Sequence, residues 1–212
     1  MARRLICLAV CAVLLVAALT SCSKPPELAE VKDELVALIE GAYEINEIFF
    51  GSGLETVDGD IYEYPTNGYE YVVEDCKYQT TTSLKLAAEQ IYSKEYLEGV
   101  YLTAFDGYAD DQVGIIAARF LDYEGFLIQE KDTSNTLDGV KKYDYDTMKI
   151  VKPSSADYLN VEIVCWLEGV KDPEKYEGLS DELGALMRGE RVTVTLTFSL
   201  GAEGWRLDCP SY

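Results

Sequence analysis

Residues 192–208 read VTVTLTFSLGAEGWRLD, and this stretch decides the fold. Apolar side chains alternate with threonine and serine from Val192 to Leu200, which is typical of a β-strand with one face in a core. The glycines at 201 and 204 turn the chain back, and the residues at 205–208 continue the alternation in a returning strand. We therefore predict a terminal hairpin whose Phe198 and Trp205 side chains point into one core.

Further strand patterns come before this hairpin. Residues 159–167 alternate between apolar and mostly polar side chains, and residues 143–151 are another candidate strand. Residues 117–122 and 126–130 flank a turn at Glu124 and Gly125. The acidic, glycine- and proline-containing stretch 169–189 predicts a long connection with room for a helical turn.

The N-terminal half has helical rather than strand periodicity. Apolar residues recur every three or four positions over residues 28–49, which predicts an amphipathic helix that ends at the glycines of residues 51–53. Gly41 inside this helix weakens it by roughly 1 kcal/mol relative to alanine. Two short helices follow, over residues 84–91 and 96–101, with the threonines at 80–82 as N-cap candidates for the first.

Helices that come first and antiparallel strands that come later indicate an α+β fold. We expect the N-terminal helices to pack on one curved, mainly antiparallel β-sheet. The hydrophobic content of 48% is enough for a real core.

The N-terminus has the pattern of an export signal. Arg3 and Arg4 precede an apolar run over residues 5–19, which is shorter than the roughly 20 residues of a membrane span. The block resembles the bacterial lipoprotein signal, in which the cysteine of the lipobox, here Cys22, receives a diacylglycerol and becomes the new N-terminus. An ordinary secretory peptide or an uncleaved anchor is the alternative.

This resemblance implies three segments. Residues 1–21 are expected to be the signal peptide, residues 22–30 the lipidated N-terminus with a short tether, and residues 31–212 a single domain. The protein is then expected on the outer face of a bacterial cell membrane, held there by lipid.

The charge of the chain limits its partners. Without residues 1–21 it keeps 16 basic and 38 acidic residues, a formal charge of −22. Such a surface is repelled by nucleic acid and by anionic lipid headgroups, so we expect basic or neutral partners and no nucleic acid.

Composition and motifs also restrict the chemistry. The chain has no histidine, the usual base of hydrolytic triads. No spacing separates a glycosidase-like carboxylate pair from solvated surface acids, and neither an EF-hand nor a glycine-rich phosphate loop is present. We expect a protein that is not an enzyme, with no cofactor and no metal site.

Three cysteines remain beyond Cys22, namely Cys76, Cys165 and Cys209. They form no C-x-x-C pair, so neither a zinc cluster nor a redox pair is indicated. Cys165 and Cys209 both lie at apolar positions of their strands. They form either a disulfide or two buried free thiols.

The candidate partner-binding residues are acids and tyrosines of residues 58–71. They are Asp58, Asp60, Tyr62, Glu63, Tyr64, Tyr69 and Tyr71. Tyrosines beside carboxylates suit a wet interface with a basic or peptide partner, and residues 54–68 read as an exposed acidic loop or a loose hairpin. Alternatively, the tyrosines pack half-buried on the face of a strand.

Several segments together resemble a known family. The chain is similar over most of residues 33–212 to the secreted bacterial IseA-type inhibitors of DL-endopeptidases and, more loosely, to NTF2-like domains. The likeness rests on YEYVV at 69–73, the threonines at 80–82, IYSKE at 91–95, TMKIV at 147–151 and GWRLD at 204–208. It implies a non-enzymatic protein that occludes the cleft of a peptidoglycan-cleaving cysteine hydrolase.

Three functional hypotheses follow from these observations. The first is a surface lipoprotein that binds and restrains a cell-wall hydrolase, and the second is an NTF2-like module that binds a small ligand or a peptide. The third is an enzyme, for which the sequence displays no catalytic groups. A deep cavity would favour the ligand-binding module, whereas a protruding acidic loop with tyrosines would favour the hydrolase inhibitor.

Overall fold

The protein has an α+β fold, as the sequence predicts. The computed structural model describes residues 24–61, 68–111, 114–131, 139–179 and 181–211. The α-helices are α2 (Leu28–Phe50), α3 (Thr81–Ile91), α4 (Lys94–Tyr101) and α5 (Glu182–Met187), with a π-helix at Leu102–Asp106 and a 3-10 helix at Pro173–Tyr176. The strands are β1 (Thr56–Ile61), β2 (Tyr69–Val72), β3 (Tyr108–Asp110), β4 (Gly114–Ile116), β5 (Phe120–Tyr123), β6 (Phe126–Glu130), β7 (Val140–Val151), β8 (Tyr158–Glu168), β9 (Val192–Gly201) and β10 (Gly204–Leu207).

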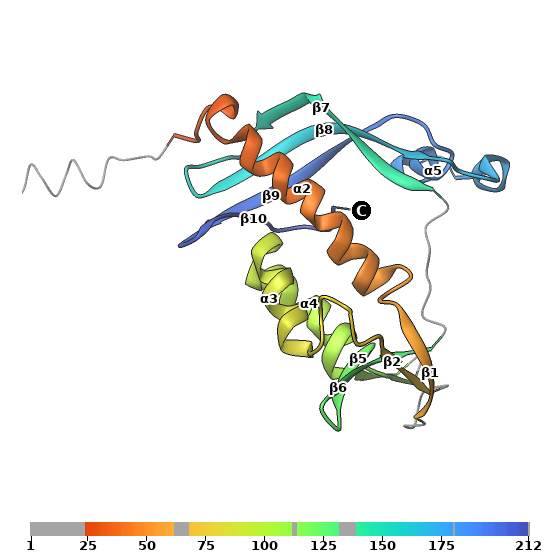
Figure 1. The fold of residues 1–212 in the computed structure, drawn as a ribbon. Helices are drawn as coiled ribbons and strands as arrows, with labels where there is room; N and C mark the ends of the chain where they lie inside the picture. Colours follow the sequence, from red (N-terminus) through yellow and green to blue (C-terminus); the bar gives the residue numbers. More distant parts are fainter. Residues whose placement is uncertain (1–23, 62–67, 112–113, 132–138, 180, 212) are drawn as a thin grey trace, which may run out of the picture.

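The strands divide into two four-stranded sheets rather than the one curved sheet that we expected. The first has the order β1-β2-β6-β5, and the second has the order β10-β9-β8-β7. All pairings within them are antiparallel. Figure 1 shows the second sheet at the top and the first at the bottom, with α2 running between them. Strands β3 and β4 form a separate two-stranded hairpin.

The sheet β10-β9-β8-β7 follows the alternation that defined it in the sequence. Phe198 and Trp205 are buried, which confirms that both face the core. The inward side chains of β8 are also buried at 2% exposure or less: Leu159, Val161, Ile163, Cys165 and Leu167. The threonines of β9 lie on the opposite face and stay partly or fully exposed.

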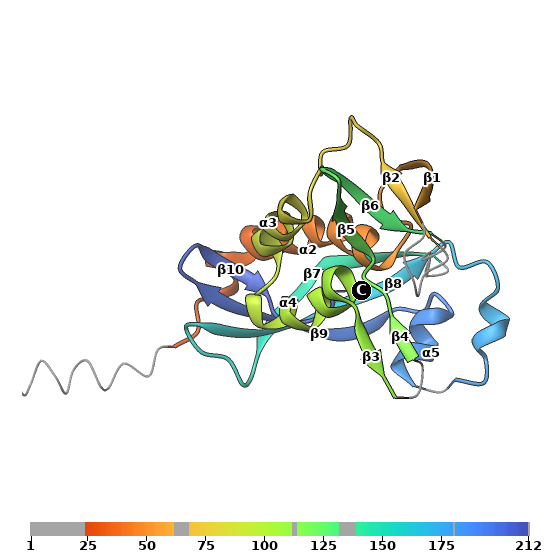
Figure 2. The ribbon, with the colours of Figure 1, turned by 90° about the horizontal axis from the view of Figure 1, so that it is seen from below.

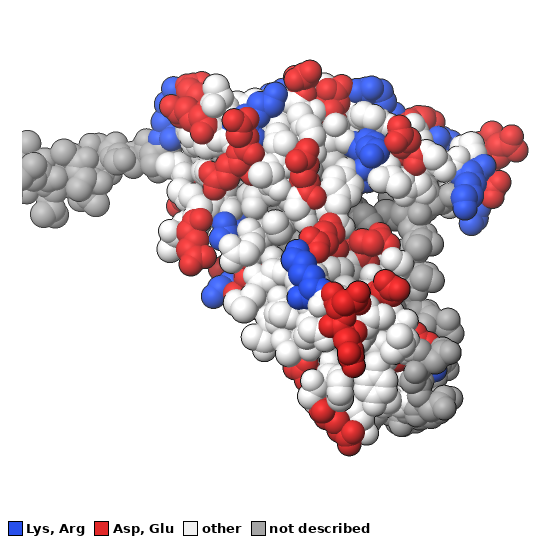
Figure 3. Space-filling model, in the orientation of Figure 1, with Lys and Arg blue, Asp and Glu red and all other residues white. Residues whose placement is uncertain are grey.

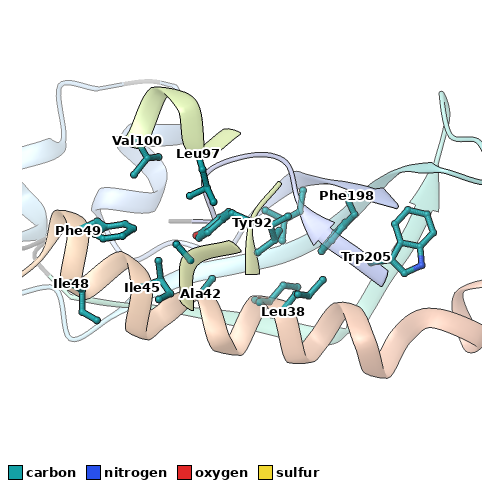
Figure 4. Packing of buried hydrophobic residues seen from close by; sticks show 14 of the residues in the cluster. Leu38, Ala42, Ile45, Ile48, Phe49, Tyr92, Leu97, Val100, Phe198 and Trp205 are labelled. Atoms are coloured by element: carbon teal, nitrogen blue, oxygen red, sulfur yellow. The ribbon is translucent and has the colours of Figure 1, made fainter. Parts of the chain in front are cut away.

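Helix α2 joins the two sheets into one core. Its buried stripe includes Leu38, Ala42, Ile45 and Phe49, the three-and-four spacing read from the sequence. Figure 4 shows these side chains pointing toward residues of α4 and the terminal hairpin. A Cβ at Gly41 would lie 2.5 Å from Cδ1 of Ile91, so the glycine lets α3 approach the backbone of α2.

One predicted boundary is corrected. Helix α2 begins at Leu28, so residues 28–30 belong to the folded domain and not to the tether. Residues 56–61 form strand β1, which pairs with β2, so the hairpin alternative for this part of the acidic stretch is confirmed. Capping chemistry is confirmed for α3, because the Thr80 side chain accepts a hydrogen bond from the Ser83 backbone at 3.1 Å.

A buried polar network ties the C-terminal tail to α2 and β7. The Tyr92 hydroxyl donates to Oδ1 of Asn46 at 2.7 Å, and Nδ2 of Asn46 donates to Oγ of Ser211 at 3.0 Å. The Tyr143 hydroxyl donates to the carbonyl oxygen of Ser211. These partners satisfy polar groups inside the core, where an unpaired group costs about 1 to 3 kcal/mol.

The three described cysteines are free thiols. Sγ of Cys209 accepts a hydrogen bond from the backbone of Thr197, which pairs with Asn160. Cys165 lies five residues further along β8, a distance of roughly 16 Å along the strand. This is beyond the reach of a disulfide, so the alternative of two free thiols applies to Cys165 and Cys209.

Candidate functional site

The described part of the predicted partner-binding stretch does not form an exposed surface. Tyr69 is 2% exposed, and its hydroxyl donates to the carbonyl oxygen of Ala118 at 2.8 Å. It is therefore a core residue, which corrects its assignment as a partner-binding residue. Tyr71 is half-buried and packs edge-on against Phe126, with ring centroids 5.6 Å apart.

The other members of that set are not placed by the structure. Asp58 and Asp60 lie in β1, between the paired residues Val57 and Ile61, and their side chains are outside the description. Tyr62, Glu63 and Tyr64 lie outside the described residues, as does Cys22.

A cleft of about 670 Å³ lies elsewhere, between the α3–α4 corner and the β9–β10 hairpin. The helices contribute Leu86, Glu89, Gln90, Tyr92, Ser93, Lys94 and Glu95 to its lining, and the hairpin contributes Ser199, Leu200, Gly201, Ala202, Glu203, Gly204, Arg206 and Asp208. A volume of 300–1,000 Å³ is typical of small-molecule sites, so roughly 670 Å³ is suitable.

Backbone contacts fix the corner of the cleft. Tyr92 forms an isolated parallel bridge with Leu207 of β10, and the Ser93 N–H donates to the Leu207 carbonyl oxygen at 2.7 Å. Ser93 is also the N-cap of α4, where its Oγ accepts from the Tyr96 N–H at 3.1 Å. The Ser93 hydroxyl donates to the carboxylate of Asp208. These hydrogen bonds therefore hold the α3–α4 corner against the end of the terminal hairpin.

Arg206 holds the other wall in place. Its Nε donates to the carbonyl oxygen of Glu89 at 2.8 Å, and Nη1 donates to the carbonyl oxygen of Trp205 at 2.8 Å. Nη2 lies 3.6 Å from the carboxylate of Glu203, and only 16% of the Arg206 side chain is exposed. Through these contacts Arg206 joins the end of α3 to β10, and its charge lies beside the carboxylate of Glu203.

The cleft carries more negative than positive charge. Its lining has four acidic residues and two basic ones. Among the described residues, Glu89, Glu95 and Lys94 make no side-chain hydrogen bond or ion pair. Figure 3 shows acidic side chains scattered over the face of the molecule in that view, with fewer basic ones between them.

A second exposed feature is the β3–β4 hairpin. Figure 2 shows it at the edge of the molecule, separate from the larger sheets. Tyr108 and Ile115 are exposed large side chains on its two strands, and Leu102 of the preceding π-helix is exposed as well. Asp106 and Asp111 are also exposed, so the hairpin region is apolar and acidic.

Sequence reasoning did not find the cleft, although part of its signal was present. The local patterns predict the strand 192–200, the turn 201–204 and the helices over residues 84–91 and 96–101. What was missing was the parallel bridge between Tyr92 and Leu207, which joins residues far apart in the chain. No local periodicity encodes such a contact.

Among the described residues, neither a metal centre nor a membrane span is found. Within the described ranges, no group of three or more acidic, cysteine or histidine side chains is arranged to hold a metal ion. In the same part of the chain, no helix is long and apolar enough to cross a membrane. Comparison of the chain with protein-family models and with curated proteins finds no match.

Proposed function

We propose that this protein is a non-enzymatic binding protein, held by a lipid at Cys22 on the outer face of a bacterial cell membrane. Its cleft between the α3–α4 corner and the β9–β10 hairpin binds a small polar ligand or a short peptide, in the manner expected of an NTF2-like module. The observation that carries the proposal is the cleft itself, with charged and aliphatic side chains on walls that backbone contacts hold in place.

The walls of the cleft are suited to binding because they are fixed before a ligand arrives. The Ser93 and Arg206 hydrogen bonds connect α3, α4 and β10, so little ordering of these elements is needed on binding. A site that is already formed avoids part of the entropic cost of association. The exposed polar groups around the apolar patch then set the orientation of the bound ligand.

The test uses the full chain in a nonionic detergent and the low-molecular-weight fraction of a bacterial envelope extract. The fraction should raise the melting temperature, because a ligand that binds only the folded state stabilises it. Ala202→Trp fills the cleft with an indole and should abolish the shift, whereas Ala29→Trp on exposed α2 should preserve it. An equal shift in both variants would contradict binding in the cleft.

Lipid attachment is tested separately at Cys22. Its thiol is the group that would form the thioether with diacylglycerol, so Cys22→Ala should abolish labelling by a radioactive fatty acid and leave the signal peptide uncleaved. The matched change Cys76→Ala should leave labelling intact. Unchanged labelling of Cys22→Ala would exclude the lipoprotein assignment.

The β3–β4 hairpin favours a second candidate function, the binding and inhibition of a peptidoglycan DL-endopeptidase. An exposed tyrosine and isoleucine beside acidic residues suit insertion into a groove with a basic rim. The full chain should slow a purified DL-endopeptidase stoichiometrically without being consumed.

A matched pair of variants tests this second function. Ile115→Ser should weaken inhibition, whereas Leu179→Ser, at an exposed leucine outside the hairpin, should not. Full hydrolase activity in a large excess of the wild-type protein would exclude this function and leave ligand binding in its place.

A further inference from the structure

The lining of the cleft combines aliphatic and acidic side chains. Helix α3 presents Leu86, Glu89 and Gln90 to it, since positions i, i+3 and i+4 share one helix face. Leu86 is 58% exposed, and Leu200 on the strand side is 45% exposed. These two leucines give the cleft an aliphatic portion that the rest of the described chain leaves open to solvent.

Four carboxylates belong to the remaining lining of the cleft. Glu89 lies one turn after Leu86 on α3, and Glu95 lies in the first turn of α4. Among the described residues neither side chain has a hydrogen-bonding or ion-pairing partner. Asp208 accepts one hydrogen bond from Ser93, and its second oxygen has no described donor.

The basic groups of the cleft do not offset these carboxylates. Arg206 already donates to two carbonyl oxygens and lies beside Glu203. Lys94 is a single exposed ammonium group on a flexible stem. The cleft therefore offers an aliphatic surface and acceptors for a positive charge.

We propose that the cleft binds a primary ammonium group carried on a short aliphatic chain, of the kind found in a lysine side chain or a linear alkylamine. This inference rests on the proposed function of the cleft. The methylene stem lies over Leu86 and Leu200, and the ammonium group donates to the carboxylates of Glu89, Glu95 and Asp208. An ammonium on a four-carbon stem combines these two properties in one group.

Other ligand classes fit less well. An anion would meet unpaired carboxylates and an arginine that already donates to two carbonyl oxygens and lies beside Glu203. The start of α4 already has Ser93 and Asp208 as partners. A neutral apolar ligand would cover carboxylates without pairing them, which costs free energy. The acidic surface of the whole chain also raises the local concentration of cations.

The test compares three probes that share one backbone. They are Nα-acetyl-lysine methylamide, its Nε-acetylated form, which lacks the charge, and Nα-acetyl-norleucine methylamide, which has only the aliphatic stem. The full chain in nonionic detergent is titrated with each, and binding is followed by calorimetry and by backbone amide shifts. The lysine probe should bind at least about tenfold more tightly than the other two, and its affinity should fall with added salt.

Matched variants locate the contacts. Glu89→Gln with Glu95→Gln should weaken binding of the lysine probe about tenfold, whereas Glu98→Gln with Glu124→Gln removes the same charge outside the cleft and should change it less than twofold. Leu86→Ser should weaken the lysine and norleucine probes by a similar factor, because both use the stem.

The outcomes separate this inference from the proposed function. Equal binding of the lysine and norleucine probes overturns the ammonium class while the cleft remains a binding site. A melting-temperature response to the envelope fraction that Ala202→Trp abolishes, without binding of the lysine probe, also overturns only the ligand class. Absence of any response to the probes and to the fraction overturns both.

Discussion

The two four-stranded sheets are built in different ways. In β10-β9-β8-β7, three strands have ten to twelve residues and the inward face alone is fully buried. In β1-β2-β6-β5, strands have four to six residues, and the central strand β6 buries both of its faces, since adjacent Leu127 and Ile128 are at most 1% exposed. A strand with one buried and one solvent-exposed face has alternating apolar and polar residues in the sequence. A strand that is buried on both faces lacks this alternation.

The largest expected effect is on the terminal hairpin. Phe198→Ala should lower the free energy of unfolding by roughly 3 to 5 kcal/mol, because the ring is completely buried between the sheet and the helices. Thr197→Ala, one position away on the wet face, should cost well under about 1 kcal/mol. Chemical denaturation measures the free energy of unfolding of both variants. Equal losses in the two variants would contradict a β9 strand that is buried on one face and exposed on the other.

The sheet β1-β2-β6-β5 should behave differently at neighbouring positions. Leu127→Ala and Ile128→Ala should each cost roughly 2 to 5 kcal/mol, since both side chains are buried although they point to opposite faces of β6. The same denaturation series serves as the measurement. A loss at only one of the two positions would show that this sheet is also buried on a single face.

The polar network next to the larger sheet should contribute less. Tyr143→Phe removes the donor to the carbonyl oxygen of Ser211 and should cost about 1 to 3 kcal/mol. Tyr158→Phe is the control, because no described partner accepts a hydrogen bond from that half-buried hydroxyl. Losses of the same size in the two variants would contradict a stabilising role for the network.

The smallest expected effect has the opposite sign. Lys141 is 8% exposed on the inward face of β7, and burial lowers the pKa of its amine below the ordinary value of 10.5. Lys141→Met should therefore raise stability at neutral pH by about 1 kcal/mol. Lys142→Met, on the outer face of the same strand, should change it by less than about 0.5 kcal/mol.

The lowered pKa of Lys141 should also make the stability of the wild-type protein depend on pH. Because the folded protein releases this proton at a lower pH than the unfolded chain, the unfolded chain holds more protons between the lowered pKa and 10.5. Wild-type stability should then rise relative to Lys141→Met as pH increases through that interval. A difference in the free energy of unfolding between the two proteins that stays constant up to pH 10.5 would contradict a lowered pKa of Lys141.

The sequence predicts the elements that have a local pattern, but it does not predict the pairings between distant segments. The strands at 159–167 and 192–200, the helix at 28–49 and the turn at Glu124 and Gly125 were predicted because each has a local periodicity or a required turn residue. The division into two sheets was missed because the pairing of β2 with β6 is not local. Tyr69 was assigned to a surface because its neighbours are polar, yet its hydroxyl has a backbone partner inside the fold.

The cleft was missed for the same physical reason. Its walls come from residues 86–95 and 199–208, and they are brought together by the contacts of Ser93 with Leu207 and Asp208 and by the hydrogen bond from Arg206 to Glu89. The sequence of each segment by itself predicts an ordinary helix or an ordinary hairpin turn. A local pattern shows what an element is but not which other element it meets.

Binding in the cleft is tested most directly by a map of backbone amide shifts in the full chain when the small-molecule fraction of an envelope extract is added. The largest changes are expected at Ser93, Lys94, Gly201 and Gly204, which line both walls of the cleft, and these changes should be lost in Ala202→Trp. Changes confined to the β3–β4 hairpin, or none at the cleft, would contradict the claim that this cleft is the binding site.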